Sequence, residues 1–252
     1  MRTIALYNLK GGVGKTTTAV NLAGLAAISG LRVLIWDLDP QNAASWYLRS
    51  DKLNSIKAKQ LIKGKQLQQQ VQASALERLD VLASNLSFRK LDLLLDKAKD
   101  GEQRLSELLT QFTKHYDLVV LDCPPSLSRV SENIFAAAEA ILVPLIPSPL
   151  SLHAYRHILE YFRLHELPRQ RLHPFFSMVD KRRKQHRDWL QTPPAELDNL
   201  LSAWLPYSST VEKMGERRAL VITYAGHTAA AEAYKALWQE LRVRLGFTSS
   251  TA

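Results

Sequence analysis

The glycine-rich stretch at residues 10–17 constrains the fold of this chain more than any other feature. It reads Lys-Gly-Gly-Val-Gly-Lys-Thr-Thr, follows an apolar run with strand character at residues 3–7, and opens an alanine-rich helical run at residues 16–28. Glycines let backbone N–H groups approach phosphate oxygens that a Cβ would obstruct, and a helix N-terminus adds partial positive charge. The stretch therefore predicts a phosphate-binding loop at a strand-to-helix corner.

Each position in this loop has an expected role. Lys15 would reach the β- and γ-phosphates, and the Thr16 hydroxyl would bind Mg²⁺. The strict pattern G-x-x-x-x-G-K-[ST] fails at one position, because Leu9 replaces its first glycine and Lys10 follows. The candidate nucleotide-binding residues in the loop are Gly11, Gly12, Val13, Gly14, Lys15, Thr16 and Thr17.

Carboxylates follow two further buried strands. Residues 33–36 run into Asp37 and Asp39, and residues 116–121 run into Asp122. The carboxyl ends of parallel strands border the crevice in which open α/β sheets bind ligands, so we expect these carboxylates beside the phosphate loop. Asp122 ends a strand of Walker B type and would hold Mg²⁺ through water. Alternatively, Asp37 or Asp39 caps the helix expected at residues 43–48.

Three short motifs together resemble the ParA/MinD family of dimeric ATPases. They are Lys10 with two glycines behind it, the D-x-D-P-Q string at 37–41, and the D-C-P-P-S string at 122–126. The resemblance implies ATP and Mg²⁺ as cofactors, with Thr16, Asp39 and Asp122 at the metal. It also implies that Asp39 orients the attacking water, that Lys10 and Lys15 contact phosphates, and that Lys10 reaches across a homodimer formed on ATP binding.

The resemblance also implies a function, to which there are two alternatives. A ParA-like ATPase binds nonspecific DNA in its ATP state, and a partner protein stimulates its weak hydrolysis to partition or position a cargo. One alternative is a MinD-like membrane ATPase. Another is a metabolic P-loop enzyme, either a ligase or a reductase, although a reductase needs more cysteine than Cys123 provides. Family likeness also places Met178 and Asp180 beside the adenine, with a core methionine and a turn aspartate as their ordinary explanations. It places Pro206, within residues 205–209, where the adenine pocket closes.

Charge supports a polyanionic partner. The chain has a formal net charge of +9, and residues 181–187 contain five cations. Arginine suits phosphate through its planar fork, whereas a solvated basic surface is the ordinary alternative. For residues 213–218 the alternative is ion pairing with Glu212 and Glu216. The candidate DNA contacts are Lys181, Arg182, Arg183, Lys184, Arg187, Lys213, Arg217 and Arg218.

Strands and helices alternate along all 252 residues. This pattern predicts one α/β domain over residues 1–252, with a doubly wound, mostly parallel sheet and helices on both faces. Residues 52–76 would be a variable basic insertion of solvated helices, and residues 228–247 a packing helix, with membrane targeting as the alternative for its apolar stripe. The sequence has no apolar run approaching the ~20 residues of a membrane span, so we expect a cytoplasmic protein. The resemblance to ParA-like ATPases that bind DNA implies that it is also nucleoid-associated.

Overall fold

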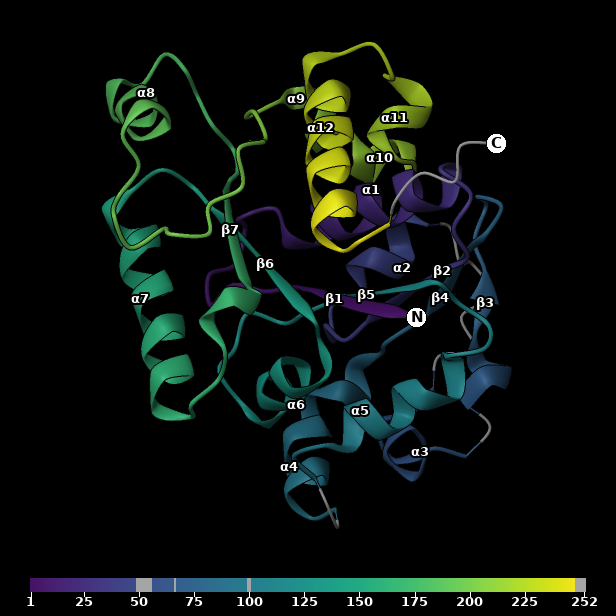
Figure 1. The fold of residues 1–252 in the computed structure, drawn as a ribbon. Coiled ribbons are helices and arrows are strands. Elements are labelled where there is room, and N and C mark those ends of the chain that lie inside the picture. Colours follow the sequence, from purple (N-terminus) through teal and green to yellow (C-terminus); the bar gives the residue numbers. More distant parts are fainter. Residues whose placement is uncertain (49–55, 66, 99–100, 248–252) are drawn as a thin grey trace.

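The computed structural model describes residues 1–48, 56–65, 67–98 and 101–247. In this part of the chain a seven-stranded sheet lies between two layers of helices (Figure 1). The strands are β1 (Arg2–Leu6), β2 (Val33–Asp37), β3 (Gln72–Ala73), β4 (Leu79–Leu82), β5 (Leu118–Asp122), β6 (Ala140–Leu145) and β7 (Leu172–Phe176). The α-helices are α1 (Lys15–Ile28), α2 (Ala43–Tyr47), α3 (Ala58–Lys63), α4 (Leu91–Asp96), α5 (Arg104–Leu109), α6 (Arg129–Ala137), α7 (Pro149–Leu164), α8 (Lys184–Gln191), α9 (Ser209–Glu212), α10 (Met214–Arg217), α11 (Val221–Tyr224) and α12 (Ala229–Arg244).

The sheet has the order β3-β4-β2-β5-β1-β6-β7. Its strands pair in parallel except at one edge, where β3 runs antiparallel to β4. The strands β2, β5 and β6 are buried along their whole length, as expected for a parallel sheet covered on both faces. The predicted doubly wound, mostly parallel α/β fold is therefore confirmed.

The strand order changes one expectation about the site. Asp37 was expected directly beside the loop that follows β1, but β5 lies between β1 and β2. In the β2–β5 register Asp37 is opposite Asp122, and in the β1–β5 register Asp122 is opposite Leu6. The Walker B strand, and not β2, therefore borders the phosphate loop. The sequence does not reveal this order, because β1, β2 and β5 all have apolar interiors.

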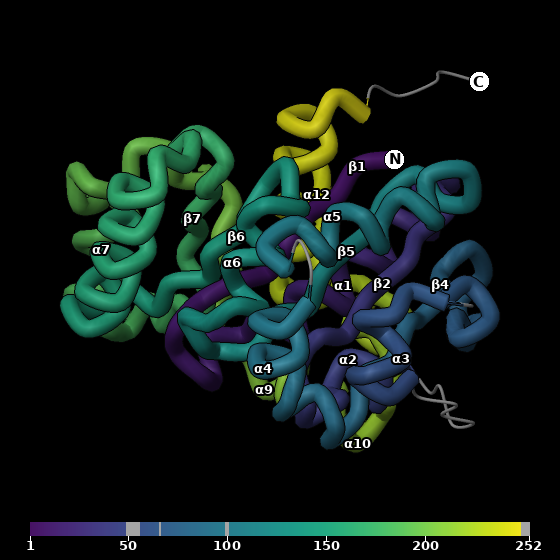
Figure 2. The backbone as a smooth tube through the Cα atoms, turned by 90° about the horizontal axis from the view of Figure 1, so that it is seen from below, coloured from purple at the N-terminus to yellow at the C-terminus, as the bar shows by residue number. Residues whose placement is uncertain are grey.

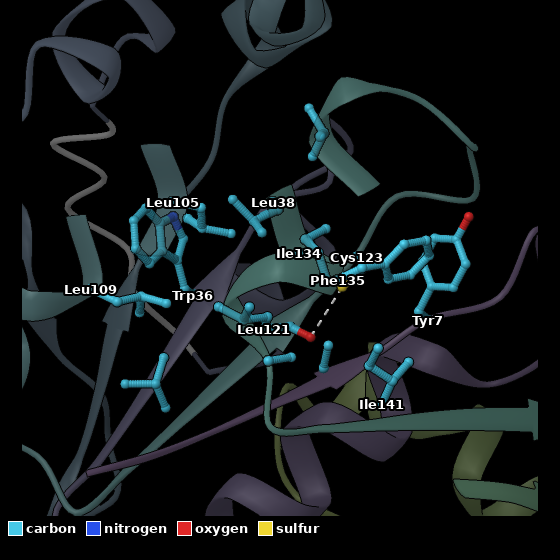
Figure 3. Close-up of a cluster of buried hydrophobic side chains, with 14 of the residues drawn as sticks. Tyr7, Trp36, Leu38, Leu105, Leu109, Leu121, Cys123, Ile134, Phe135 and Ile141 are labelled. Carbon is cyan, nitrogen blue, oxygen red and sulfur yellow. Dashed lines mark hydrogen bonds between the residues drawn. The ribbon is translucent and has the colours of Figure 1, made fainter. Parts of the chain in front are cut away.

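One face of the sheet packs against α3 to α7, the layer that faces the viewer in Figure 2. Figure 3 shows part of this core, in which Trp36 of β2 lies near Leu105 and Leu109 of α5, and Tyr7 lies beside Phe135 of α6. The Phe135 ring makes edge-to-face contacts with Tyr7 at 4.7 Å and Phe162 at 5.2 Å between ring centroids. These contacts fix α6, the helix that follows the loop after Asp122.

The other face packs against α1 and α12. A Cβ on Gly24 of α1 would lie 2.4 Å from a methyl group of Leu220, so the two segments pack closely. The predicted apolar stripe of the last helix faces this core, and its members are Tyr234, Leu237, Trp238, Leu241 and Leu245. Because these side chains are buried in the core, little of the stripe is available to contact a lipid surface. Among the described residues, no helix has the length and apolarity needed to cross a membrane.

The prediction of solvated helices at residues 52–76 is wrong in part. The described portion contains α3 and also the edge strand β3, and Ile56, Leu61 and Leu67 are buried in the core. Lys57, Lys59, Lys63 and Lys65 are exposed, as expected, whereas Lys52 lies outside the described residues. The high lysine and glutamine content concealed a few well-spaced apolar residues that pack under the sheet edge.

The Phe135 contacts lead to a stability prediction. Phe135→Ala should lower the free energy of unfolding by about 3–5 kcal/mol, because the side chain is fully buried and a cavity would remain among its aromatic neighbours. Urea denaturation followed by circular dichroism measures this. Leu93→Ala is the control, since Leu93 is 63% exposed, and its effect should stay within about 0.5 kcal/mol. Equal effects of the two substitutions would contradict the packing described here.

Candidate nucleotide site

The loop between β1 and α1 has a backbone conformation that favours glycine. Gly12 and Gly14 have φ angles of +70° and +91°, in the left-handed region. A Cβ on Gly14 would lie 3.1 Å from the Ser177 hydroxyl, whereas a Cβ on Gly11 or Gly12 would have no heavy atom within 4 Å. The predicted cradle is therefore closed beside Gly14 and open beside Gly11 and Gly12, where a phosphate could approach the backbone.

A buried asparagine anchors this loop. The Asn8 Nδ2 donates to the carbonyl of Pro144 at 2.7 Å, and its Oδ1 accepts from the backbone N–H of Lys10 at 2.9 Å. Asn8 is fully buried at the end of β1. Sequence reasoning missed this residue, although a polar side chain directly after a buried apolar strand was a usable signal.

Lys15 lies inside the loop that precedes it. Its side chain is buried, and its Nζ donates to the carbonyl of Lys10 at 2.9 Å. Burial lowers the pKa of the Lys15 ammonium, and the nearby carboxylates Asp122 and Asp39 oppose that change. A buried cation held by backbone dipoles is well placed for a phosphate group, whose negative charge would offset the cost of burying the ammonium.

The two buried aspartates differ in their partners. Asp37 accepts hydrogen bonds from the N–H and hydroxyl of Ser45 and from the N–H of Asp39, at 3.1–3.2 Å. Ser45 lies in the first turn of α2, so Asp37 has the helix-capping role that was the alternative interpretation. Asp122 is fully buried, and neither of its oxygens has a hydrogen-bond partner among the described residues. Burial, followed by the charge of Asp37, raises the pKa of Asp122 well above its usual value.

The unpartnered Asp122 carboxylate fits a cation. A buried carboxylate without partners is costly, and a bound ion would remove much of that cost. Thr16 is close enough for its hydroxyl to lower the pKa of Asp122, so two of the three predicted metal-binding residues face one place. In the part of the chain that the structure describes, no three His, Cys, Asp or Glu side chains are placed to hold a metal. Mg²⁺ suits such a site, because it keeps several waters and takes substrate phosphates as ligands.

Asp39 occupies a turn between β2 and α2 and is partly exposed. Its Oδ1 accepts from the N–H of Gln41 at 2.9 Å, and its carbonyl accepts a hydrogen bond from the buried Ser84 hydroxyl. Its charge also acts on Lys15 and Asp122, which places it beside them. Ser84 was missed by the sequence analysis, because it follows β4 and contacts the turn only in the folded chain.

The loop after Asp122 is held from β1. The Tyr7 hydroxyl donates to the carbonyl of Ser126 at 2.9 Å. Cys123 is buried in the core beside Leu121, whose carbonyl accepts from its Sγ at 3.4 Å (Figure 3). Burial raises the pKa of the Cys123 thiol well above its usual value, so the thiol stays protonated and unreactive.

Met178 and Pro206 lie at the edge of the phosphate loop. Val179 and Pro206 form an isolated parallel bridge, and Met178 has a left-handed backbone with φ of 54°. Both residues line a pocket together with Gly14, Thr17 and Tyr234. The two predicted adenine contacts are therefore brought to the loop from segments more than 150 residues further along the chain.

The first candidate DNA cluster, residues 181–187, is exposed but partly neutralised. Arg182 makes a two-pronged ion pair with Asp180 at 2.9 Å, which lowers the pKa of that carboxyl to about 2. Lys184 pairs with Asp188 at 2.8 Å, and Arg187 donates to the backbone carbonyls of residues 181 and 182. Part of the positive charge of residues 181–187 is therefore neutralised within the chain.

The second candidate group, residues 213–218, includes the short helix α10. Glu212, directly before this group, accepts from the Tyr207 hydroxyl at 2.8 Å. Arg218 has a left-handed backbone with φ of 46°, and its guanidinium lies 4.1 Å from the centre of the Trp46 ring on α2. Lys213 and Arg217 are exposed. Figure 1 shows this group at α10, apart from the first group at α8, so the candidates form two separate basic surfaces.

Comparison with known proteins agrees with this fold and site. The family model described as "AAA domain" matches residues 1–172. The chromosome partitioning protein ParA of Myxococcus xanthus is 36% identical over 146 residues, which cover 57% of this chain and 52% of ParA. The sporulation initiation inhibitor protein Soj of Bacillus subtilis is 32% identical over 163 residues, 64% of each chain. The chain thus spans about half to two thirds of the length of these relatives.

Solved structures extend the similarity in fold over nearly the whole chain. The ATP complex of a Cyanothece McdA variant superposes with a TM-score of 0.82 at 20% identity, covering 100% of this chain and 99% of McdA. The septum site-determining protein MinD of Pyrococcus horikoshii, complexed with Mg-ADP, gives a TM-score of 0.78 at 20% identity and covers 99% of both chains.

The sheet order, the glycine cradle with its buried lysine, and the carboxylate at the end of β5 define a P-loop nucleotide-binding protein. Within that class, the chain belongs to the ParA/MinD family of P-loop ATPases.

Proposed function

We propose that this protein is an ATPase that partitions or positions a cargo, binding DNA without sequence preference in its ATP state. The observation that carries the proposal is the pairing of a buried, unpartnered Asp122 carboxylate with the buried Lys15 ammonium beside an open glycine cradle. Such a site is suited to a magnesium-bound polyphosphate. The family relatives named ParA and Soj support the partitioning role.

The residues of the site have distinct tasks in hydrolysis. Backbone N–H groups from Gly11 to Gly14 bind phosphate oxygens, and Lys15 contacts the β- and γ-phosphates. Thr16 and Asp122 would hold Mg²⁺, which neutralises phosphate charge when bound. Asp39 holds the attacking water in line, and Ser84 keeps the Asp39 backbone in place through its hydrogen bond to the carbonyl.

We base the proposed homodimer on Lys10. Its backbone carbonyl already accepts from Lys15, so the loop conformation fixes where the Lys10 side chain leaves the chain. We propose that this side chain reaches the phosphates bound by a second copy, and that ATP therefore favours a homodimer. A partner protein would stimulate hydrolysis and release the dimer from the nucleoid.

The exposed side chains of residues 181–187 are proposed to bind DNA phosphates. Arg182, Arg183 and Lys184 expose 84%, 70% and 82% of their side chains. Contacts of this kind release counterions, so binding should weaken steeply as salt increases. Arg183 is the strongest candidate, because its Nε lies 3.9 Å from Asp180, whose oxygens are already engaged by Arg182.

Charge reversal tests this assignment. The double substitution R182E/R183E should reduce retention on nonspecific duplex DNA with ATP by at least about tenfold and lower its salt dependence, since two phosphate contacts are replaced by repulsion. Retention is measured with ATP, with ADP and without nucleotide at two salt concentrations. ATP binding should be unchanged, because neither residue lies in the loop at residues 10–17.

Arg163→Glu is the control for a charge reversal elsewhere on the surface, and it makes half of the charge change of R182E/R183E. Arg163 on α7 is 68% exposed and pairs with Glu160, so its reversal changes the net charge without touching residues 181–187. DNA retention should then fall only slightly. Unchanged retention of R182E/R183E would move the DNA surface elsewhere, with Lys213 and Arg217 next. Wild-type protein that binds anionic vesicles and no DNA in its ATP state would favour the MinD-like function.

A further inference from the structure

Two histidines face each other on the exposed side of α7, outside the nucleotide site. His153 and His157 are one helical turn apart, so their side chains lie on the same face of the helix. Both are exposed, and their Nε2 atoms are 3.2 Å apart, with ring centroids separated by 4.6 Å. The two Nε2 atoms are within hydrogen-bond distance of each other, so the two imidazoles lie together on the solvent side of the helix.

This separation matches the spacing of two nitrogen ligands on one metal ion. Zn–N distances are about 2.0–2.1 Å, so two histidine nitrogens on a tetrahedral ion lie roughly 3.3 Å apart, and at a right angle roughly 2.9 Å apart. The observed 3.2 Å lies between these values. An ion could therefore bind with small rotations of the two rings and no change in the helix.

We propose that His153 and His157 form a surface site for a divalent transition-metal ion, such as Zn²⁺, Ni²⁺ or Cu²⁺. Imidazole suits these ions, and a pair of histidines at positions i and i+4 on one helical face is an established arrangement for zinc. Water completes the coordination. The site differs in chemistry from the nucleotide site, where oxygen ligands favour Mg²⁺.

Among the described residues, the side chains near His153 and His157 add no further ligands to the site. The two oxygens of Glu160 both accept from Arg163, so this carboxylate is engaged elsewhere. Arg156 is held by Glu196. His165, which directly follows α7, stacks on Tyr161 with ring centroids 4.1 Å apart. The protein therefore supplies two ligands, and a bound ion would link the side chains of His153 and His157 across one helical turn.

Calorimetric titration with Ni²⁺ tests the site directly. The experiment uses the untagged full chain with excess Mg²⁺, which occupies the oxygen ligands of the nucleotide site. Wild-type protein should bind one Ni²⁺ per chain at this pair, and His157→Gln should weaken that binding by at least about tenfold, because one imidazole remains. Affinity should also fall in acid, since protons compete with the metal for imidazole nitrogen.

His165→Gln is the matched control. It removes an exposed histidine that directly follows the same helix and should leave the Ni²⁺ affinity unchanged. Thermal unfolding gives a second readout, because an ion that binds the folded state raises Tm. Nickel should raise Tm of wild type and His165→Gln and leave His157→Gln unmoved. If His157→Gln binds Ni²⁺ as tightly as wild type, or if His165→Gln loses the binding, the proposal is wrong. Neither result depends on ATP hydrolysis or DNA binding.

Discussion

Lys15→Ala should abolish ATP binding. The Lys15 ammonium is buried within its own loop and donates to the Lys10 carbonyl, so the site places one fixed cation where phosphates enter. A charge-assisted hydrogen bond contributes about 1.5–3 kcal/mol, and two such contacts to the β- and γ-phosphates correspond to an affinity loss of more than about 100-fold. Calorimetric titration with ATP and Mg²⁺ measures the effect.

Thermal unfolding distinguishes a loss of ATP binding at the site from a loss caused by unfolding of the variant. Lys15→Ala removes a buried charge, so the variant should be at least as stable as wild type in thermal unfolding without nucleotide. Lys184→Ala is the control, because Lys184 is 82% exposed on α8 and should keep wild-type ATP affinity. A folded Lys15→Ala protein that binds ATP as tightly as wild type would show that residues 10–17 are not the phosphate site.

The parts of the fold and site that could be predicted are those encoded locally. Gly14 begins α1 with a left-handed backbone, and Asp122 ends a strand with no polar residue between 118 and 121. Each of these signals is contained in a few neighbouring residues. They form a strand, a turn whose backbone conformation would be strained in a residue with a side chain, and a helix. For the same reason the apolar stripe of α12 was readable, because helical spacing alone places its members on one face.

The remaining features depend on contacts between distant segments. Whether β5 or β2 borders β1 is decided by packing of whole layers, which strand composition does not reveal. Ser84 reaches Asp39 across 45 residues, and Tyr7 reaches Ser126 across 119. Arg182 pairs with Asp180 only two residues away, but a dense run of cations does not show which of them an acid neutralises. The carboxylates that follow β2 and β5 were predictable from their positions, whereas the contacts of Asn8 and Ser84, which also follow strands, were not.

Asp39→Ala should preserve ATP binding and reduce hydrolysis by at least about 100-fold. Of the hydrogen bonds described for Asp39, the carboxylate makes one, to the N–H of Gln41, while its backbone is fixed by Ser84 and Asp37. Alanine keeps those backbone contacts, so the turn should stay folded. The variant would lose the group that positions the water, and positioning accounts for much of the rate in phosphoryl transfer. Phosphate release under saturating ATP measures it.

Asp37→Ala is the comparison that separates a catalytic role of Asp39 from a structural one. The Asp37 carboxylate accepts from Ser45 and from the N–H of Asp39, so Asp37→Ala should loosen α2, lower Tm and weaken nucleotide binding together. Asp39→Ala should change turnover alone and leave the protein in its ATP-bound dimer, which size-exclusion chromatography with ATP would detect. Normal hydrolysis by Asp39→Ala would remove the catalytic role from Asp39, and a fall in Tm equal to that of Asp37→Ala would make both aspartates structural.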